Sequence, residues 1–141
     1  MFKASVYKTR RAALLKGLEA RGVKKGLVVL VGNGESPMNY RDNAYPFRQD
    51  SSFLYFFGPS KPGLAASIDL ASGEAFLYGD DPSIDDIVWT GPETSVAELA
   101  EAAGTQGSQA RSGLAAAVRG AAARGAAPLL FFPPYRDETR V

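Results

Sequence analysis

Residues 45–58 read Tyr45-Pro46-Phe47-Arg48-Gln49-Asp50-Ser51-Ser52-Phe53-Leu54-Tyr55-Phe56-Phe57-Gly58, in which the polar residues Arg48, Gln49 and Asp50 lie between aromatic ones. We expect the aromatic rings to be buried, so that Arg48, Gln49 and Asp50 need fixed hydrogen-bond partners. A guanidinium in such surroundings is held by a carboxylate or by carbonyl oxygens. The stretch therefore predicts a polar latch, formed by Arg48, Gln49 and Asp50, at the edge of an aromatic core. Residues 53–57 are predicted to be extended, and Tyr45 to have a structural role.

The segments on either side of this stretch predict a mixed α/β domain. Before it, Ser5 is a candidate N-cap for an amphipathic helix that ends near Arg21, and residues 27–31 predict a strand buried on both faces. After it, residues 64–70 and 75–78 flank a hairpin turn, and residues 87–89 favour a short strand. The remaining segments are a capping box at 95–98 that opens a helix ended by Gly104, a linker over 105–113, a helix over 109–124 and a buried strand over 129–132. This order predicts a mixed central sheet flanked by helices.

The composition excludes several classes of catalytic site. The chain has 141 residues, a length typical of one domain, and contains neither histidine nor cysteine. Disulfides, thiolate metal sites, Ser-His-Asp triads and histidine-containing zinc sites are therefore impossible in it. Any catalysis would rest on carboxylate, Lys, Tyr or Ser side chains alone.

Charge is unevenly distributed along the chain, although the net charge is only +1. Residues 1–25 hold eight of the sixteen basic residues, and residues 69–101 hold nine acidic residues and no basic ones. We interpret the basic helix as a solvated face, and Asp80, Asp81, Asp85 and Asp86 as exposed turn residues rather than a cation site. Residues 32–34 predict a plain turn, since a phosphate-binding loop needs an immediate helix. No nucleic acid is expected as a partner.

Neither a membrane span nor a signal peptide is expected from the sequence. No stretch approaches the roughly 20 apolar residues that a spanning helix needs, and no uninterrupted apolar segment follows Met1. A cytoplasmic location without membrane contact is therefore predicted.

Residues 45–58 closely resemble the Tyr-Pro-(Phe/Tyr)-Arg-Gln-(Asp/Asn)-Ser-x-Phe-x-Tyr-x-x-Gly signature of the N-terminal domain of aminopeptidase P (Xaa-Pro aminopeptidase). Asp42 lies where that family has an aspartate, three residues before the Tyr-Pro pair, and residues 87–91 resemble its segment with a tryptophan before a glycine. Three positions depart from the pattern: Phe57 replaces a small hydroxyl residue, Asn39 an arginine, and Lys61 an acidic residue.

The resemblance implies a creatinase-like fold with a ribonuclease H-like motif, forming a single domain over residues 1–141 with no catalytic residue. In the family, the catalytic C-terminal half has a pita-bread fold and binds two divalent metal ions, typically manganese, through carboxylates and a histidine. In that family the two metal ions generate a bridging hydroxide, which attacks the carbonyl of a Xaa-Pro bond. The resemblance thus implies the catalytic domain of the same parent, other copies in a homo-oligomer and, indirectly, proline-containing peptides as partners.

Two residues are expected to contribute to the active-site cleft of such a parent. Trp89 is expected to pack its broad apolar face against a proline ring or peptide, with an ordinary half-buried core position as the alternative. Asp42 is expected to receive the amino end of the substrate or to pair with an arginine across an interface, with loop capping as the alternative. Two other functions stay open, a stand-alone peptide- or protein-binding module and a nucleic-acid or nucleotide binder.

Overall fold

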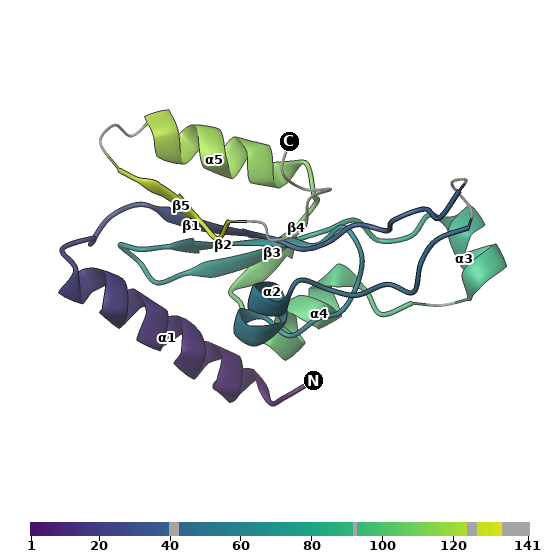
Figure 1. The fold of residues 1–141 in the computed structure, drawn as a ribbon, viewed down its shortest axis with the longest axis horizontal. Helices are drawn as coiled ribbons and strands as arrows, with labels where there is room; N and C mark the ends of the chain where they lie inside the picture. Colours follow the sequence, from purple (N-terminus) through teal and green to yellow (C-terminus); the bar gives the residue numbers. More distant parts are fainter. Residues whose placement is uncertain (40–42, 92, 124–126, 134–141) are drawn as a thin grey trace.

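The structure, a computed structural model, describes residues 1–39, 43–91, 93–123 and 127–133 (Figure 1). The elements in chain order are α1 (Ala4–Ala20), β1 (Leu27–Val31), α2 (Ser51–Phe56), β2 (Ala65–Asp69), β3 (Ala75–Tyr78), α3 (Ile84–Thr90), α4 (Val96–Ala103), β4 (Gly107–Gln109), α5 (Gly113–Ala123) and β5 (Leu129–Phe131). No helix in the described ranges is both long enough and apolar enough to cross a bilayer.

The five described strands form one mixed sheet in the order β4-β3-β2-β1-β5. Strand β2 pairs antiparallel with β1 and with β3, whereas β1 pairs parallel with β5 and β3 parallel with β4. It follows that β1, β3, β4 and β5 run in one direction and β2 in the other. The predicted mixed central sheet is confirmed.

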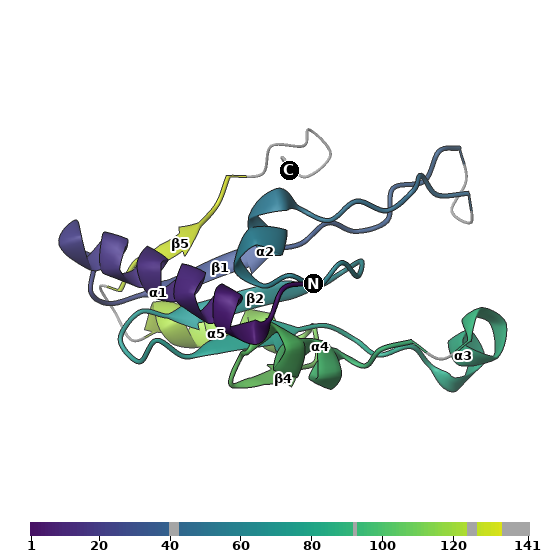
Figure 2. The same ribbon diagram turned by 90° about the horizontal axis from the view of Figure 1, so that it is seen from below.

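Helices cover both faces of the sheet, with α1, α2 and α4 on one face and α5 on the other (Figures 1 and 2). Because side chains alternate along a strand, Val28 and Leu30 of β1 join the larger core cluster with Phe53 of α2. Leu27 and Val29 join the second cluster, with Leu114 and Ala121 of α5. The prediction that residues 27–31 are buried on both faces is confirmed for all but Val31, which is exposed.

Helix α1 begins slightly earlier than predicted and buries one of its charges. Lys3, not Ser5, is the N-cap residue, and its side chain makes no capping hydrogen bond. Tyr7 and Arg11 are the buried residues, and Leu14 and Leu18 pack against the larger cluster. Because these positions recur every three or four residues, Arg11 faces the core rather than water. The interpretation of the basic helix as a uniformly solvated face is wrong at Arg11.

Two aromatic or β-branched segments predicted as extended are helical instead. Asp50 Oδ1 accepts a hydrogen bond from the Phe53 N–H at 2.9 Å and so caps α2. Phe53 and Phe57, four residues apart, then stack inside the core with their ring centroids 5.5 Å apart. Residues 87–89 lie in α3, where the Ile87 N–H donates to the Ser83 carbonyl.

The C-terminal third combines confirmed and wrong predictions. The capping box of Ser95 and Glu98 is present in α4, and Gly104 ends that helix in the left-handed conformation at φ 64°. The predicted linker 105–113 contains β4, because Gly107–Gln109 pairs with β3 through backbone hydrogen bonds that need no apolar side chain. Strand β5 forms as predicted but is not fully buried, since Leu129 and Phe131 are exposed.

Candidate functional site

Two long segments leave the same end of the sheet. The first arm follows β1 and comprises residues 32–39 and 43–50; the second arm follows β3, comprises residues 79–91 and 93–95, and includes α3. Because β1 and β3 run in the same direction, both arms start at the carboxyl ends of their strands. Both extend away from the packed helices, and Figure 2 shows them well separated.

Gln49 holds the base of the first arm. Its side chain is 1% exposed, and Oε1 accepts hydrogen bonds from the N–H groups of Asn33 at 2.7 Å and of Asp50 at 3.0 Å. Its Nε2 donates to the Lys61 carbonyl at 2.9 Å. Asn33 Nδ2 donates to the Arg48 carbonyl at 2.8 Å. One buried amide thus joins three separate segments of the chain.

The predicted polar latch exists, but its central residue is Gln49 rather than Arg48. The Arg48 side chain is exposed, so the expectation of a buried guanidinium is wrong, and only the Arg48 carbonyl takes part in the latch. Asp50 takes part as the N-cap of α2. Tyr45 is also exposed, and its backbone N–H donates to the Ser36 carbonyl across the arm. Asp42 lies outside the described residues.

The base of the second arm is held by acidic side chains. Asp80 Oδ1 accepts from the Arg111 N–H at 2.9 Å, and Asp81 Oδ1 accepts from the Val96 N–H at 2.7 Å. Lys61 Nζ lies 3.4 Å from Glu93 Oε2, so residue 61 contacts the base of both arms. Asp80 and Asp81 are exposed, as predicted, and each binds a specific backbone N–H group. Asp85 and Asp86, which were also predicted to lie in a turn, belong to helix α3 instead. In the described residues no group of His, Cys, Asp or Glu side chains is arranged to hold a metal ion.

The apolar face of α3 is open to solvent. Ile84 is 82% exposed and Val88, one turn later, 73%, with Ile87 beside them. Figures 1 and 2 both place α3 away from the body of the domain. Trp89 belongs to this helix, although its side chain lies outside the described part of the structure.

Arg11 is a structural residue that the sequence reasoning missed. Its Nη1 donates to the Phe56 carbonyl at 2.9 Å, and its Nη2 donates to the carbonyls of Ala103 at 3.0 Å and Gly104 at 2.7 Å. The guanidinium also lies over the Phe57 ring at 5.0 Å. Burial lowers the pKa of Arg11 to about 10, which leaves it charged at neutral pH. Arg11 lies four residues after Tyr7 on α1, and this helical spacing is the sequence pattern that could have placed it on the buried face.

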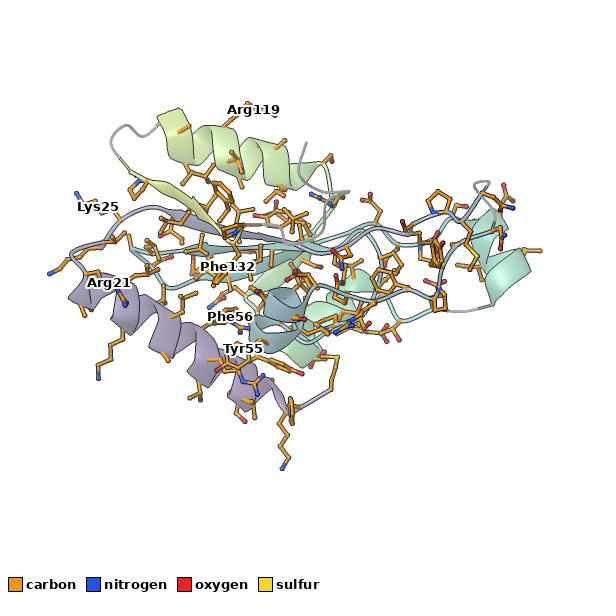
Figure 3. The ribbon with its side chains drawn as sticks, in the orientation of Figure 1. Arg21, Lys25, Tyr55, Phe56, Arg119 and Phe132 are labelled. Atoms are coloured by element: carbon orange, nitrogen blue, oxygen red, sulfur yellow. The ribbon has the colours of Figure 1, made fainter. Side chains whose placement is uncertain are left out.

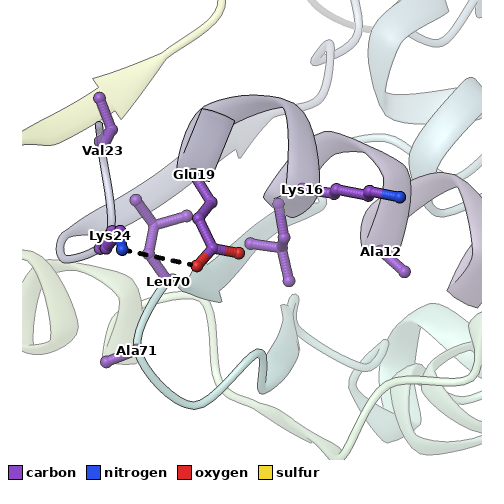
Figure 4. A pocket seen from close by; sticks show the side chains of 8 residues that line it. Ala12, Lys16, Glu19, Val23, Lys24, Leu70 and Ala71 are labelled. Atoms are coloured by element: carbon purple, nitrogen blue, oxygen red, sulfur yellow. Dashed lines mark ion pairs between the residues drawn. The ribbon is translucent and has the colours of Figure 1, made fainter. Parts of the chain in front are cut away.

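A surface hollow lies at the C-terminal end of α1, with a volume of about 420 Å³ (Figure 4). Lys24 and Glu19 on its rim form a 3.9 Å ion pair, and both side chains are largely exposed. Exposed pairs of this kind contribute little, so the hollow offers no fixed polar group to orient a ligand.

Residues 7–130 match the family model described as the aminopeptidase P N-terminal domain. The chain belongs to this family. Among curated proteins, a probable Xaa-Pro aminopeptidase of Talaromyces stipitatus is 34% identical over 77 residues, covering 55% of this chain and 15% of the relative. A probable Xaa-Pro aminopeptidase of Sordaria macrospora is 31% identical over 94 residues, covering 65% of this chain and 15% of the relative.

Solved structures of aminopeptidase P from E. coli share the fold. The low-pH form gives a TM-score of 0.66 at 20% identity, covering 79% of this chain and 25% of that one. The complex with the inhibitor Pro-Leu gives a TM-score of 0.71 at 19% identity, covering 85% of this chain and 27% of that one. The predicted fold class is confirmed. The chain therefore spans about 15% of the curated relatives' length and about a quarter of the solved chains, and corresponds to the N-terminal domain of Xaa-Pro aminopeptidase-like proteins.

Proposed function

We propose that this chain is the non-catalytic N-terminal domain of a metal-dependent Xaa-Pro aminopeptidase. In this proposal it contributes to oligomer assembly and forms one wall of the active-site cleft. The observation that carries the proposal is the pair of arms on a domain of this family, each anchored at its base and extended away from the packed core. Segments that are anchored at the base and exposed beyond it are expected to contact another domain or subunit.

The second arm supplies the proposed wall. An isolated helix that exposes Ile84 and Val88 leaves apolar surface in water, and such surface is typical of sites that bind a partner. Trp89 lies on the same helix, and a tryptophan face is well suited to pack on a proline ring. Asp42 is proposed to receive the amino end of the substrate or to pair with an arginine across the interface.

Metal chemistry in this proposal belongs to the catalytic part of the parent protein. The sequence contains no histidine, and the described acidic residues at the arm bases bind backbone N–H groups. This donor set does not fit the proposed pair of manganese ions, and we derive no catalytic step through a metal here. A cytoplasmic location stays a prediction.

The proposal is tested in two assays. The purified chain supplied with manganese is expected to leave Xaa-Pro peptides intact. In the parent protein, Trp89→Ala is expected to raise KM about tenfold or more with a smaller change in kcat, because it removes substrate contact. The matched control is Phe2→Ala, an exposed aromatic residue at the N-terminal end of α1, which should change neither constant. Cleavage by the chain alone, or equal effects of the two variants, would contradict the proposal.

The open α3 face also favours a second candidate, a stand-alone peptide- or protein-binding module. A titration of the chain with proline-containing peptides, followed by Trp89 fluorescence, separates the two functions. A saturable response by the isolated chain supports the binding module. The wall proposal predicts no saturation, because half of the peptide site lies on the catalytic domain.

A further inference from the structure

Three aromatic side chains gather where α2 meets the end of β5, and a fourth, on β5 itself, lies on the opposite face of that strand. They are Tyr55 and Phe56 of α2, Phe131 of β5, and Phe132, and we call them the aromatic edge. The Tyr55 and Phe56 rings are perpendicular at 5.0 Å, and the Phe56 and Phe132 rings lie 5.6 Å apart. Figure 3 shows Tyr55, Phe56 and Phe132 on the side of the sheet that α1 covers.

The aromatic edge exposes much of its surface. Phe131 is 67% exposed, Tyr55 51% and Phe132 39%. The guanidinium of Arg10 lies over the Tyr55 ring at 4.2 Å and donates to the Tyr55 carbonyl at 2.8 Å, which fixes that ring at the surface. Contiguous aromatic residues with an arginine beside them are enriched at the buried centres of protein interfaces.

The aromatic edge also borders an open strand. Strand β5 pairs with β1 and ends the sheet order, so in the described structure its other edge has no strand partner. Leu130 points into the larger core cluster, and alternation then places Phe131 on the opposite face. Apolar side chains therefore flank the open backbone edge on both faces, an arrangement that natural proteins usually cover.

We propose that the aromatic edge is the surface on which the catalytic part of the parent protein docks. This inference rests on the proposed function, since it requires a parent with that second part. The matching solved chains are about four times longer than the segment this chain covers, and β5 is the last element described here. Polypeptide that continues beyond β5 is tethered beside the aromatic edge, where a short tether gives an effective concentration of roughly millimolar.

A second copy fits this surface less well. Self-pairing of sheet edges needs a strand long enough for a self-complementary ladder, whereas β5 has only three residues and lies between Pro128 and Pro133. Prolines at both ends limit the number of backbone hydrogen bonds that another β5 can make. Side-chain packing against a tethered domain has no such requirement.

Hydroxyl-radical footprinting of the intact parent protein tests the inference. We expect Tyr55, Phe131 and Phe132 to be labelled about tenfold more slowly than their exposed fractions in this structure predict, because docking removes solvent access. The protection should persist on dilution, since the partner belongs to the same chain. The double variant Tyr55→Ser with Phe132→Ser should restore labelling of Phe131, whereas Arg21→Met, a change of an exposed residue at the far end of α1, should not.

The outcomes separate failure of this inference from failure of the proposed function. Rapid labelling of all three rings in a parent that cleaves Xaa-Pro peptides overturns the docking surface and leaves the proposed function standing. Protection that disappears on dilution assigns the surface to a second copy and also overturns the inference. A parent without peptidase activity contradicts the proposed function itself. If the double variant misfolds, labelling of the unmodified parent still shows whether the aromatic edge is covered.

Discussion

The Gln49 side chain and the Asn33 backbone are joined by a buried hydrogen bond of 2.7 Å, and Asn33 in return donates to the carbonyl of Arg48. The contact fixes the first arm at its base, because residue 33 lies near the start of the arm and residue 49 near its end. Gly32 allows this approach, since a Cβ there would lie 2.7 Å from Gln49 Oε1. The arm is therefore rooted by a side-chain amide rather than by sheet pairing.

Gln49→Glu should destabilise the domain in a pH-dependent manner. A buried carboxylate cannot donate to the Lys61 carbonyl, and burial should raise the pKa of the introduced carboxyl above its unfolded value. The folded state then binds more protons, so the loss of stability should be small below about pH 4 and grow as the pH rises. At neutral pH we expect a loss of roughly 3 kcal/mol in urea unfolding.

Gln49→Met is the control for this charge effect. It removes all the side-chain hydrogen bonds of Gln49 without adding an ionisable group, so the loss of stability should not vary between pH 4 and pH 7. If the loss of unfolding free energy caused by Gln49→Glu did not depend on pH, the side chain at position 49 would not be buried.

Arg11→Met should lower the free energy of unfolding by roughly 2–4 kcal/mol, because three carbonyls lose their donor. Two of them belong to the end of α4 and one to the end of α2, so hydrogen exchange should increase at both helix ends. Arg21→Met is the matched control: Arg21 is exposed, and its guanidinium donates to Gly17 of its own helix. Equal effects of the two substitutions would refute the role given to Arg11.

Ser95→Ala should lower the free energy of unfolding by about 1 kcal/mol in urea unfolding, since it removes the N-cap of α4.

Hydrogen bonds from the Ser95 backbone and side chain lower the pKa of Glu98. A carboxyl with a lowered folded pKa contributes stability above its unfolded pKa and loses that contribution as the pH falls through the folded value. The difference in stability between wild type and Glu98→Gln should therefore vanish in acid.

Gly58→Ala should be among the most destabilising changes in the domain. Gly58 has φ +94°, and a Cβ there would lie 2.3 Å from the buried Tyr7 ring. Gly63→Ala separates backbone strain from this clash, because Gly63 also has positive φ (+73°) but open space around it. Thermal unfolding should show a clearly larger loss for Gly58→Ala; similar losses would mean that the ring moves aside.

The sheet could be predicted largely from the sequence, because β1, β2 and β3 combine apolar runs with clear turn residues. The helices α2 and α3 could not, since Phe, Tyr, Ile and Val favour strands by propensity alone. In both segments the deciding signal was spacing: Phe53 and Phe57 are four residues apart, as are Ile84 and Val88. Strand β4 was missed because its backbone pairing leaves no pattern in three polar or small residues.

The candidate site was predicted in part. The motif 45–58 located the latch, but sequence alone did not distinguish Arg48 from Gln49 as the buried member. An uncharged amide both donates and accepts, so it can satisfy N–H and C=O groups together at a lower desolvation cost than a guanidinium. The expected roles of Trp89 and Asp42 stay predictions.

Strand β2 lies between the strands that carry the two arms, so the arms start two strand spacings apart, about 10 Å. That gap is comparable to the diameter of one helix or the width of one extended peptide with its side chains. The sheet therefore fixes the distance between the bases of the two arms. A change in the length of either arm would leave the distance between the two bases unchanged, so the reach of the arms and the spacing of their bases can be altered independently.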